Sequence, residues 1–316
     1  MVLPVAPGQS VVDAAIAADV PLRFDCTTGN CGTCIAHCTG GDVDTEICAV
    51  VSEVEAAGGM VATCLTRLRA DVTLELDYPL APLPSPPQRH AARLASLDRV
   101  SATVSRLNIE LVAPDDFRFQ PGQYLRLRAP GLKVARAYSI ASTMAELPLV
   151  ELLIRHVPGG QMAGWLEERA QPGDRLALHG PLGSFGLDDR HRRQVFIAGG
   201  TGLAPVLAMI RTRPKDTTML LCFGCTLAED LFYEAELRAL AVTTPGLEIR
   251  LAVMGGARGA VRSGTAVGLL RDADLIGAAG YYLCGPPPMV EAARALLTAR
   301  GVPARAIRSE RFQPGG

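Results

Sequence analysis

CTTGNCGTC, residues 26–34, places three cysteines four and two residues apart, and Cys64 follows after a long interval. The pattern Cys-x4-Cys-x2-Cys with a distant fourth cysteine is typical of plant-type 2Fe-2S clusters, whose irons are held by cysteine thiolates. Gly29 and Gly32 suit a tight loop around such a cluster, because glycine accepts backbone angles that other residues avoid. The spacing predicts a 2Fe-2S cluster and one-electron transfer, with four metal ligands: Cys26, Cys31, Cys34 and Cys64.

Two other metal sites use related ligands. A structural zinc site also takes four cysteines, but these commonly arrive as two short-spaced pairs, and Cys64 has no cysteine close to it in the sequence. A Rieske site would need two histidine ligands, and only His37 follows a cysteine closely, three residues after Cys34. Cys38 and Cys48 do not fit the plant-type spacing, and we interpret them as free cysteines that pack like small apolar residues.

The whole chain sets outer limits on function. Its 316 residues favour roughly two to three domains. The 31 basic and 32 acidic side chains balance, so no overall field draws the protein to nucleic acid or to an anionic membrane. Apolar stretches such as residues 195–208 are interrupted and fall short of the roughly 20 residues of a membrane span. The start MVLPVAPGQS lacks the features of a secretory signal, so we expect a cytoplasmic protein.

The segments around the cysteine loop predict a small first domain. Ser10 and Asp13 form a helix-start pattern, and apolar residues recur at helical spacing as far as Val20. Residues 71–77, DVTLELD, alternate apolar and polar side chains as a half-buried strand does. Five prolines between residues 79 and 87 then favour extended backbone. We therefore expect a domain over residues 1–78 and a linker over residues 79–97.

The pattern changes twice after the linker. Short β-rich segments separated by Pro-Gly or Gly-Gly turns predict an antiparallel barrel over residues 98–190, with strands in VSATVSRL, QYLRLR, RAYSI, LVELLIR and DRLALHG. Over residues 191–316, strand-like and helix-like segments alternate, which implies a parallel sheet covered on both faces. The strands expected there lie in VFIAGG, TTMLLCFG, EIRLAV and YYLCG, and the helices in LAPVLAMI, DLFYEAELRAL and MVEAARALLTA.

Two segments of the predicted barrel together suggest an FAD site. The tetrapeptide Arg136-Ala137-Tyr138-Ser139 offers a guanidinium for a pyrophosphate, a ring for stacking and a hydroxyl, although alone it fits an ordinary amphipathic strand better. RHVPGGQMAGWL, residues 155–166, adds a glycine pair leading into a helix whose N-terminal amides can hold phosphate. This second segment contributes the candidate FAD contacts Gly160, Met162 and Ala163.

Two further motifs point to a dinucleotide. A glycine-rich turn, residues 198–202, follows the predicted strand VFIA and opens a predicted helix, which is the context that a phosphate-binding loop requires. YYLCGPPPM places Cys284 at the end of a predicted strand, where open parallel sheets bind their ligands. Taken alone, Cys284 fits a buried strand cysteine, and only the other motifs favour a ligand-binding role.

Four motifs occur in the order CTTGNCGTC, RAYS, GGTGLAP and CGPPPM. Together they resemble the single-chain reductases of bacterial aromatic-ring dioxygenases, and the likeness covers nearly the whole chain. HVPGG, GPLGS and the ending Gln313–Gly316 look similar to naphthalene dioxygenase reductases, and benzoate dioxygenase reductases are similar too. The resemblance implies a multidomain α+β and α/β fold: a β-grasp ferredoxin domain, an antiparallel β-barrel FAD domain and a parallel-sheet α/β NAD domain.

The resemblance also implies roles for single residues. Arg136 would hold the FAD pyrophosphate, Tyr138 would flank the isoalloxazine, and Ser139 would hydrogen-bond near the flavin N5. Cys284 would lie near the nicotinamide C4 and Glu310 close to the reacting rings, so the expected catalytic residues are Ser139, Cys284 and Glu310. The remaining cofactor contacts expected are Ala137, Gly199, Gly200, Thr201, Gly202, Pro205, Gly285, Pro286 and Phe312.

The chain departs from the family pattern at two places. Ala163 stands where many relatives have Ser or Thr, which removes one hydroxyl from the expected phosphate cradle, although backbone amides and Gly160 can compensate. Relatives also carry a further strand before the segment that matches VLPVAPGQS. That strand pairs with the one expected over residues 71–77, so its absence predicts an unpaired sheet edge there, or a natural start that lies further upstream.

These observations predict an enzyme that passes electrons from NADH to FAD, then to the cluster, then to another protein. Hydride carries two electrons and the cluster accepts one, and flavin is the group that splits the pair. After the strand TTMLLCFG, residues 225–230 contain two carboxylates and no Arg or Lys, which favours NADH over NADPH because a 2′-phosphate usually requires an Arg. Arg250 on the next strand is a basic residue that weighs against this preference.

The expected acceptor is a separate ferredoxin or the Rieske centre of a ring-hydroxylating dioxygenase. A di-iron monooxygenase comes next, because its reductases share this domain order, and a deoxysugar dehydratase system is a third alternative. Two non-enzymatic hypotheses remain. The first is an electron carrier without catalysis, which the loop at Gly199 and the motif at Cys284 oppose. The second is a zinc-binding interaction protein, which would be colourless.

Overall fold

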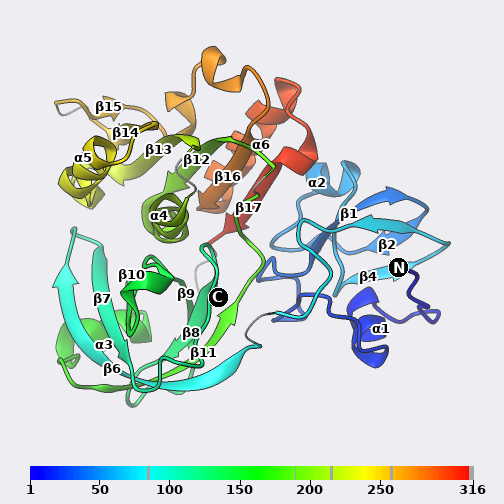
Figure 1. Ribbon diagram of the computed structural model, residues 1–316, viewed down its shortest axis with the longest axis horizontal. Coiled ribbons are helices and arrows are strands. Elements are labelled where there is room, and N and C mark those ends of the chain that lie inside the picture. The colour runs from blue at the N-terminus through cyan, green and yellow to red at the C-terminus, as the bar shows by residue number, and fades with distance from the viewer. Residues whose placement is uncertain (84–85, 189, 214–215, 257–258, 313–316) are drawn as a thin grey trace. The chain divides into compact units, whose positions relative to one another are not determined.

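The computed structural model describes residues 1–83, 86–188, 190–213, 216–256 and 259–312 (Figure 1). The chain forms two compact units. The first contains Met1–Pro86 with Leu182–Phe185, and the second contains Pro87–Pro181 with the chain from Gly186 onward. Pro84 of the predicted linker and the ending Gln313–Gly316 lie outside the described residues.

The first unit is built on short strands around the cysteine loop. Strands β3, β1 and β5 form an antiparallel sheet in that order, and β2 pairs with β4. Cys34 and Cys64 belong to its buried core together with Val12, Val51 and Met60. Its elements are α1 (Val11–Ala17), β1 (Ile35–Gly40), β2 (Val43–Thr45), α2 (Glu53–Ala57), β3 (Met60–Ala62), β4 (Thr66–Leu68) and β5 (Thr73–Glu75).

Helix α1 confirms the predicted start and corrects the predicted end. The Ser10 hydroxyl accepts a hydrogen bond from the Asp13 amide at 3.1 Å, as expected of an N-cap. The helix ends at Ala17 rather than Val20, because Asp19 takes a left-handed φ of 52° and turns the chain away. Within the described residues, β5 is an edge strand, paired with β1 on one side only.

The second unit begins with a nearly closed antiparallel barrel. Its strand order is β10-β7-β6-β11-β8-β9, and a bridge between Ile140 and Leu152 joins the two ends. Trp165 of α3 packs into the barrel core with Leu107, Ile109 and Leu125. The elements are β6 (Gln88–Arg99), β7 (Val104–Leu111), β8 (Tyr124–Arg128), β9 (Arg136–Ser139), η1 (Met144–Glu146), β10 (Leu149–Arg155), α3 (Gln161–Glu168) and β11 (Arg175–Leu182).

Strand β6 corrects the expected linker. Residues 88–97, assigned to the linker, form most of β6, which pairs with both β7 and β11. Ala92 and Leu94 are buried while Arg93 between them is exposed, the alternation of a strand with one face on the core. Arginines and alanines obscure this pattern in the sequence, since neither is typical of strands.

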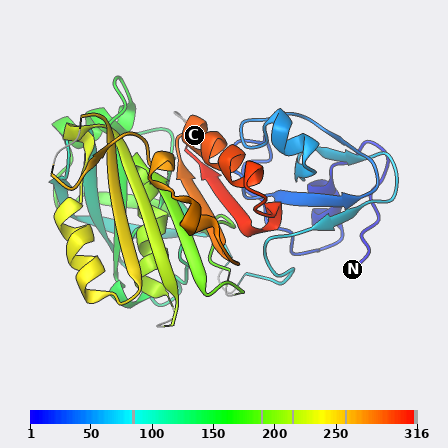
Figure 2. The same cartoon turned by 90° about the horizontal axis from the view of Figure 1, so that it is seen from above.

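The rest of the second unit is a six-stranded parallel sheet, in the order β15-β14-β13-β12-β16-β17 (Figure 2). Helix α6 packs on one face, where Val290, Ala293 and Leu297 join the buried cluster. The elements are β12 (Arg193–Gly199), η2 (Gly200–Gly202), α4 (Leu203–Thr212), β13 (Thr218–Leu227), η3 (Ala228–Asp230), α5 (Glu234–Thr243), β14 (Leu247–Gly255), β15 (Arg262–Ser263), η4 (Val267–Leu269), η5 (Asp272–Leu275), β16 (Gly280–Gly285), α6 (Pro287–Ala299), η6 (Ala304–Ala306) and β17 (Ile307–Arg311).

The strand order marks the place where open α/β sheets usually bind a ligand. From β12 the chain proceeds outward through β13 and β14, and it later returns to place β16 on the other side of β12. The order therefore reverses between β12 and β16, and the crevice at the carboxyl ends of such strands is the usual binding place in open α/β sheets. Strand β17, which the sequence patterns did not predict, lies next to β16 and carries Glu310.

Candidate functional site

The four predicted cluster ligands form two pairs. The Cys34 thiol donates to the Cys64 sulfur at 3.3 Å, and Cys31 hydrogen-bonds to Cys26. No three potential metal ligands of the described residues gather around a single point. Two pairs fit a two-iron cluster, in which each iron takes two of the four thiolates, better than one zinc ion that gathers all four ligands.

Backbone amides point at the first of these sulfurs. Thr28 N and Asn30 N donate to Cys26 Sγ at 3.5 and 3.3 Å. A hydrogen bond from Cys31, aided by these amides, lowers the pKa of Cys26 to about 4, and a hydrogen bond from Cys34 lowers the pKa of Cys64 to about 7. The thiolate is the form that binds metal, so each pair already holds one sulfur close to its ligating state.

The loop around these sulfurs depends on glycine. Gly29 has a φ of +72°, and a Cβ there would come within 2.7 Å of the Cys48 Cβ. No larger residue fits this position without displacing its neighbours. Cys48 thus packs against the loop, and the Cys38 thiol donates to the Gly40 carbonyl oxygen at 3.5 Å. Neither observation adds a fifth ligand.

The candidate FAD residues lie on β9 and at the start of α3. Ser139 is buried at the end of β9, where it pairs with Tyr124 of β8. Tyr138 packs against the barrel core, and desolvation raises the pKa of its hydroxyl. Gly160 is the N-cap of α3 and offers no side-chain cap, so the amides of the first helical turn, including those of Met162 and Ala163, remain available to an anion.

The candidate dinucleotide loop lies at the reversal point of the sheet. A Cβ at Gly202 would collide with the Cys284 carbonyl oxygen, and one at Gly285 would come within 2.9 Å of the Gly199 carbonyl oxygen. The glycine-rich turn, from the end of β12 through η2, therefore lies as close to the end of β16 as it does only because both positions lack side chains. Pro205 is buried in the first turn of α4, and Pro286 precedes α6. Thr201 lies within η2.

The three expected catalytic residues come together. The Ser139 hydroxyl donates to Glu310 Oε2 at 3.2 Å, and the Cys284 thiol lies 3.8 Å from the same oxygen. Cys284 and Glu310 are partners in the register of β16 and β17, whereas Ser139 belongs to the barrel. The Phe312 amide donates to the Gly285 carbonyl oxygen at 2.9 Å, which continues the pairing past β17.

Burial determines the protonation of Glu310 and Cys284. Desolvation raises the pKa of Glu310 to about 7, although hydrogen bonds from Ser139 and Cys284 oppose the shift. Desolvation and the neighbouring Glu310 also raise the pKa of Cys284 well above its ordinary value. Cys284 is therefore a neutral thiol near neutral pH, and Glu310 titrates there.

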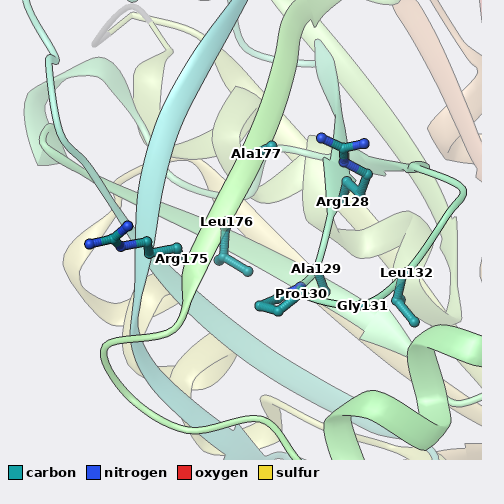
Figure 3. A pocket seen from close by; sticks show the side chains of 8 residues that line it. All are labelled: Arg128, Ala129, Pro130, Gly131, Leu132, Arg175, Leu176 and Ala177. Atoms are coloured by element: carbon teal, nitrogen blue, oxygen red, sulfur yellow. The ribbon is translucent and has the colours of Figure 1, made fainter.

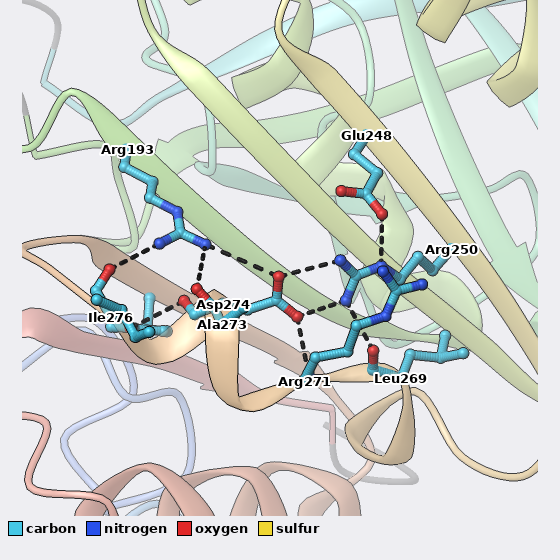
Figure 4. Close-up of polar contacts among 9 residues, drawn as sticks. Arg193, Glu248, Arg250, Leu269, Arg271, Ala273, Asp274 and Ile276 are labelled. Carbon is cyan, nitrogen blue, oxygen red and sulfur yellow. Dashed lines mark hydrogen bonds and ion pairs between the residues drawn. The ribbon is translucent and has the colours of Figure 1, made fainter.

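Arg250 belongs to an ion-pair network (Figure 4). It lies on β14, where its Nε donates to Glu248 Oε1 at 2.7 Å and its Nη2 to Asp274 Oδ1 at 3.0 Å. Its Nη1 contacts the second oxygen of Asp274 and donates to the Leu269 carbonyl oxygen at 2.9 Å. Both Arg250 and Asp274 are buried, and the hydrogen bond with Asp274 raises the pKa of Arg250. All three nitrogens of the Arg250 guanidinium therefore bond to other groups of the protein.

A separate cavity of about 360 Å³ lies on the barrel, lined by residues 128–132 and 175–177 (Figure 3). Its two arginines, Arg128 and Arg175, point in different directions, so they do not converge on one ligand. None of the predicted cofactor residues lines it.

Comparisons with known proteins match all three parts of the chain. The 2Fe-2S iron-sulfur cluster binding domain matches residues 1–69, the oxidoreductase FAD-binding domain residues 91–186, and the oxidoreductase NAD-binding domain residues 196–295. The electron transfer component of Pseudomonas putida toluate 1,2-dioxygenase is 32% identical over 312 residues, which cover 96% of this chain and 93% of the relative. The chain belongs to the 2Fe-2S flavoprotein reductases of multicomponent oxygenases.

Other members of this reductase family serve different oxygenases. Component C of methane monooxygenase from Methylosinus trichosporium is 38% identical over 270 residues, covering 80% of this chain and 78% of the relative. The crystal structure of the Amycolatopsis cytochrome P450 reductase GcoB is similar with a TM-score of 0.76 and 31% identity, over 99% of this chain and 97% of that one.

The family assigns the general activity. This reductase is an oxidoreductase of the ferredoxin–NAD(+) reductase type, with domains for a 2Fe-2S cluster, FAD and NAD(P)H, and it transfers electrons to a multicomponent oxygenase. In the described part of the reductase, no helix is both long enough and apolar enough to cross a bilayer.

Sequence reasoning missed the residues that join the barrel to the nucleotide sheet. Thr103 donates to Asp230, 127 residues away, and Tyr233 donates to Glu151, 82 residues away. No local pattern marks these partners, because each contact depends on how two separately patterned domains pack. The left-handed backbone of Tyr233 is likewise invisible in the sequence.

Proposed function

We propose that this reductase takes electrons from NADH and delivers them one at a time to the oxygenase component of a ring-hydroxylating dioxygenase, directly or through a ferredoxin. In this proposal Cys26, Cys31, Cys34 and Cys64 hold the cluster. Bound FAD accepts two electrons from the nicotinamide and releases them singly, which the cluster requires. The chain's own task is to hold the two cofactors in the correct orientation and to exclude water between them.

The observation that carries the proposal is the meeting of Ser139, Cys284 and Glu310. Ser139 and Glu310 are 3.2 Å apart although they belong to the barrel and to the sheet. The barrel residues Arg136 and Tyr138 share a strand with Ser139, and Cys284 is the penultimate residue of β16, beside the glycine-rich loop. A flavin held by β9 and a nicotinamide held at the end of β16 would therefore react at this point.

The nucleotide preference rests on the residues after β13. Residues 225–230 contain Glu229 and Asp230 but no Arg or Lys, and carboxylates repel the 2′-phosphate of NADPH. Arg250, a basic residue on the next strand β14, bonds Asp274 and Glu248. Both observations favour NADH.

Steady-state reduction of an artificial acceptor tests this preference. We expect kcat/KM for NADH to exceed that for NADPH by at least about tenfold, which corresponds to roughly 1.4 kcal/mol. Equal values for the two nucleotides would contradict the proposal.

A di-iron monooxygenase is the second candidate acceptor, because the similar proteins include reductases of propane and methane monooxygenases. The two candidates separate in one experiment. The NADH-reduced protein is mixed with a purified Rieske oxygenase or with a purified di-iron hydroxylase, and reoxidation of its cluster is followed in a stopped-flow instrument. Faster reoxidation by the di-iron protein would overturn the first choice.

A further inference from the structure

The segment between β13 and α5 is held by the FAD barrel. The Ala102 amide donates to the Glu229 carbonyl oxygen at 3.2 Å, and the Thr103 hydroxyl donates to Asp230 Oδ1 at 2.6 Å. A hydrogen bond to a charged acceptor is stronger than one between neutral groups, so the Thr103 contact is the stronger of the two. The turn between β6 and β7 is therefore hydrogen-bonded to η3 through both its backbone and a side chain.

A second contact holds the other end of the same segment. The Tyr233 hydroxyl donates to Glu151 Oε1 at 3.0 Å, and Tyr233 is buried with a left-handed φ of 61°. Such a backbone is unfavourable for a bulky residue and persists only where its surroundings fix it. Glu151 of β10 also forms an ion pair with Arg211 at 3.5 Å, so the barrel carboxylate is itself anchored.

Further hydrogen bonds stabilise the turn between β6 and β7. Arg99 Nε donates to the Ser101 carbonyl oxygen at 3.2 Å, and its Nη2 contacts the Ala102 carbonyl oxygen. The His156 amide donates to the Thr103 carbonyl oxygen at 2.7 Å, and the His156 ring is hydrogen-bonded to Ser105 at 2.8 Å. The turn is therefore a fixed support for η3.

The segment between β13 and α5 lies at the position where sheets of this kind usually recognise a nucleotide ribose. It follows directly on β13, which pairs with β12 as far as Gly199, the start of the glycine-rich loop. An acidic residue after the second strand of such a sheet usually bonds the adenosine ribose. Asp230 is bonded to Thr103, whereas the side chain of Glu229 is exposed. Glu229 is thus the carboxylate of this pair that faces outward.

We propose that the FAD barrel sets the nucleotide selectivity of the reductase, with Thr103 and Glu151 as positioning residues that hold Glu229 against the ribose hydroxyls. This inference rests on the proposed preference for NADH. It goes further by assigning selectivity to residues of a different domain from the one that binds the nucleotide.

Thr103→Val and Glu151→Gln test the inference in the full-length holoprotein, with Thr298→Val on the exposed side of α6 as the matched control. Calorimetric titration of the oxidised protein with NAD+ and with NADP+ measures binding without turnover. For each test variant we expect the Kd for NAD+ to rise about five- to tenfold and the ratio of Kd values for NADP+ and NAD+ to fall by a similar factor. The KM for NADH should rise while kcat stays within twofold, and the flavin and cluster spectra should not change.

Thr103→Ser keeps the hydroxyl and should retain the wild-type ratio of the Kd values for NADP+ and NAD+. If Thr103 acted only through its volume, the smaller Ser would not retain this ratio. Unchanged nucleotide affinity in both Thr103→Val and Glu151→Gln would overturn the inference. The wild-type protein tests the proposed function on its own, because equal Kd values for NAD+ and NADP+ would contradict the NADH preference. Glu229→Lys then separates a wrong positioning role from a wrong ribose assignment. If Glu229→Lys shifts selectivity toward NADP+ and the two barrel variants do not, only the positioning role is wrong. If Glu229→Lys leaves selectivity unchanged, both the ribose assignment and the positioning role are wrong.

Discussion

The Ser139 hydroxyl on the flavin barrel donates a hydrogen bond to Glu310 on the last strand of the nucleotide sheet, with 3.2 Å between Oγ and Oε2. The two residues are 171 positions apart in the sequence. Cys284 approaches the same carboxylate oxygen from the adjacent strand. The bond therefore marks the place where the two cofactor-binding domains of this reductase meet.

Ser139→Ala removes the barrel side of this contact. We expect the rate of flavin reduction by NADH to fall about tenfold, or roughly 1.4 kcal/mol of barrier, because a buried donor near the reacting rings is lost. The absorption of the cluster should not change. Stopped-flow reduction measures the rate, and Ser263→Ala on the exposed strand β15 serves as the control. An unchanged rate would remove Ser139 from the mechanism.

Glu310→Gln tests the charge of the sheet residue. Burial raises the pKa of Glu310 from its ordinary 4.5 to about 7, so the carboxyl is neutral below that pH and ionised above it. The ionised form binds the Ser139 hydroxyl more tightly and opposes the negative charge that arrives with the electrons. We therefore expect flavin reduction to slow as the pH rises through about 7, and the Gln variant to lack this step. The same pH profile in both proteins would contradict the assignment.

The same shift predicts the pH dependence of stability. A carboxyl whose pKa is raised by folding binds more protons in the native than in the unfolded state between pH 4.5 and about 7. Its contribution to stability is complete below pH 4.5 and is lost as the pH rises through about 7. Thermal melting across pH 5–8 should therefore show a smaller decline for Glu310→Gln than for the wild type.

Gly202→Ala tests the close approach of η2 and β16. The added methyl group would collide with the Cys284 backbone, and such overpacking costs about 1–3 kcal/mol. Denaturant unfolding should show this loss. Gly164→Ala in α3 is the control, because open space surrounds that position and Ala is the better helix former by roughly 0.5–1 kcal/mol. Equal stability of the two variants would show that η2 can move away from β16.

Cys64→Ser tests the most distant cluster ligand. We expect it to lose the red-brown absorption and most of its iron, while Cys38→Ser and Cys48→Ser retain both. Iron, zinc and acid-labile sulfide are measured on the purified proteins. A wild-type protein that contains zinc without sulfide would refute the cluster assignment.

The sequence predicted those features whose signal is local. The spacing of Cys26 to Cys34 marks the cluster loop, and the apolar run over 149–155 coincides with β10 residue for residue. Ser10 marks the start of α1 because its capping contact spans only three residues. These patterns require no knowledge of the rest of the fold.

Other features depend on distant partners. β17 reads IRSER, a short mixed segment with three charges that becomes a strand because β16 pairs with it. β6 is rich in Arg and Ala, so its strand character comes from β7 and β11 on its two sides. The contact from Thr103 to Asp230 joins two domains, and no pattern within either domain encodes it.

An anaerobic titration with NADH, followed by visible absorption and by electron paramagnetic resonance, tests the central claim most directly. The account predicts that NADH bleaches the flavin band and that the paramagnetic signal of a one-electron-reduced 2Fe-2S cluster appears in the same titration. A flavin that bleaches while no cluster signal develops would contradict electron transfer from FAD to the cluster, and a flavin that NADH does not bleach would contradict the reductase itself.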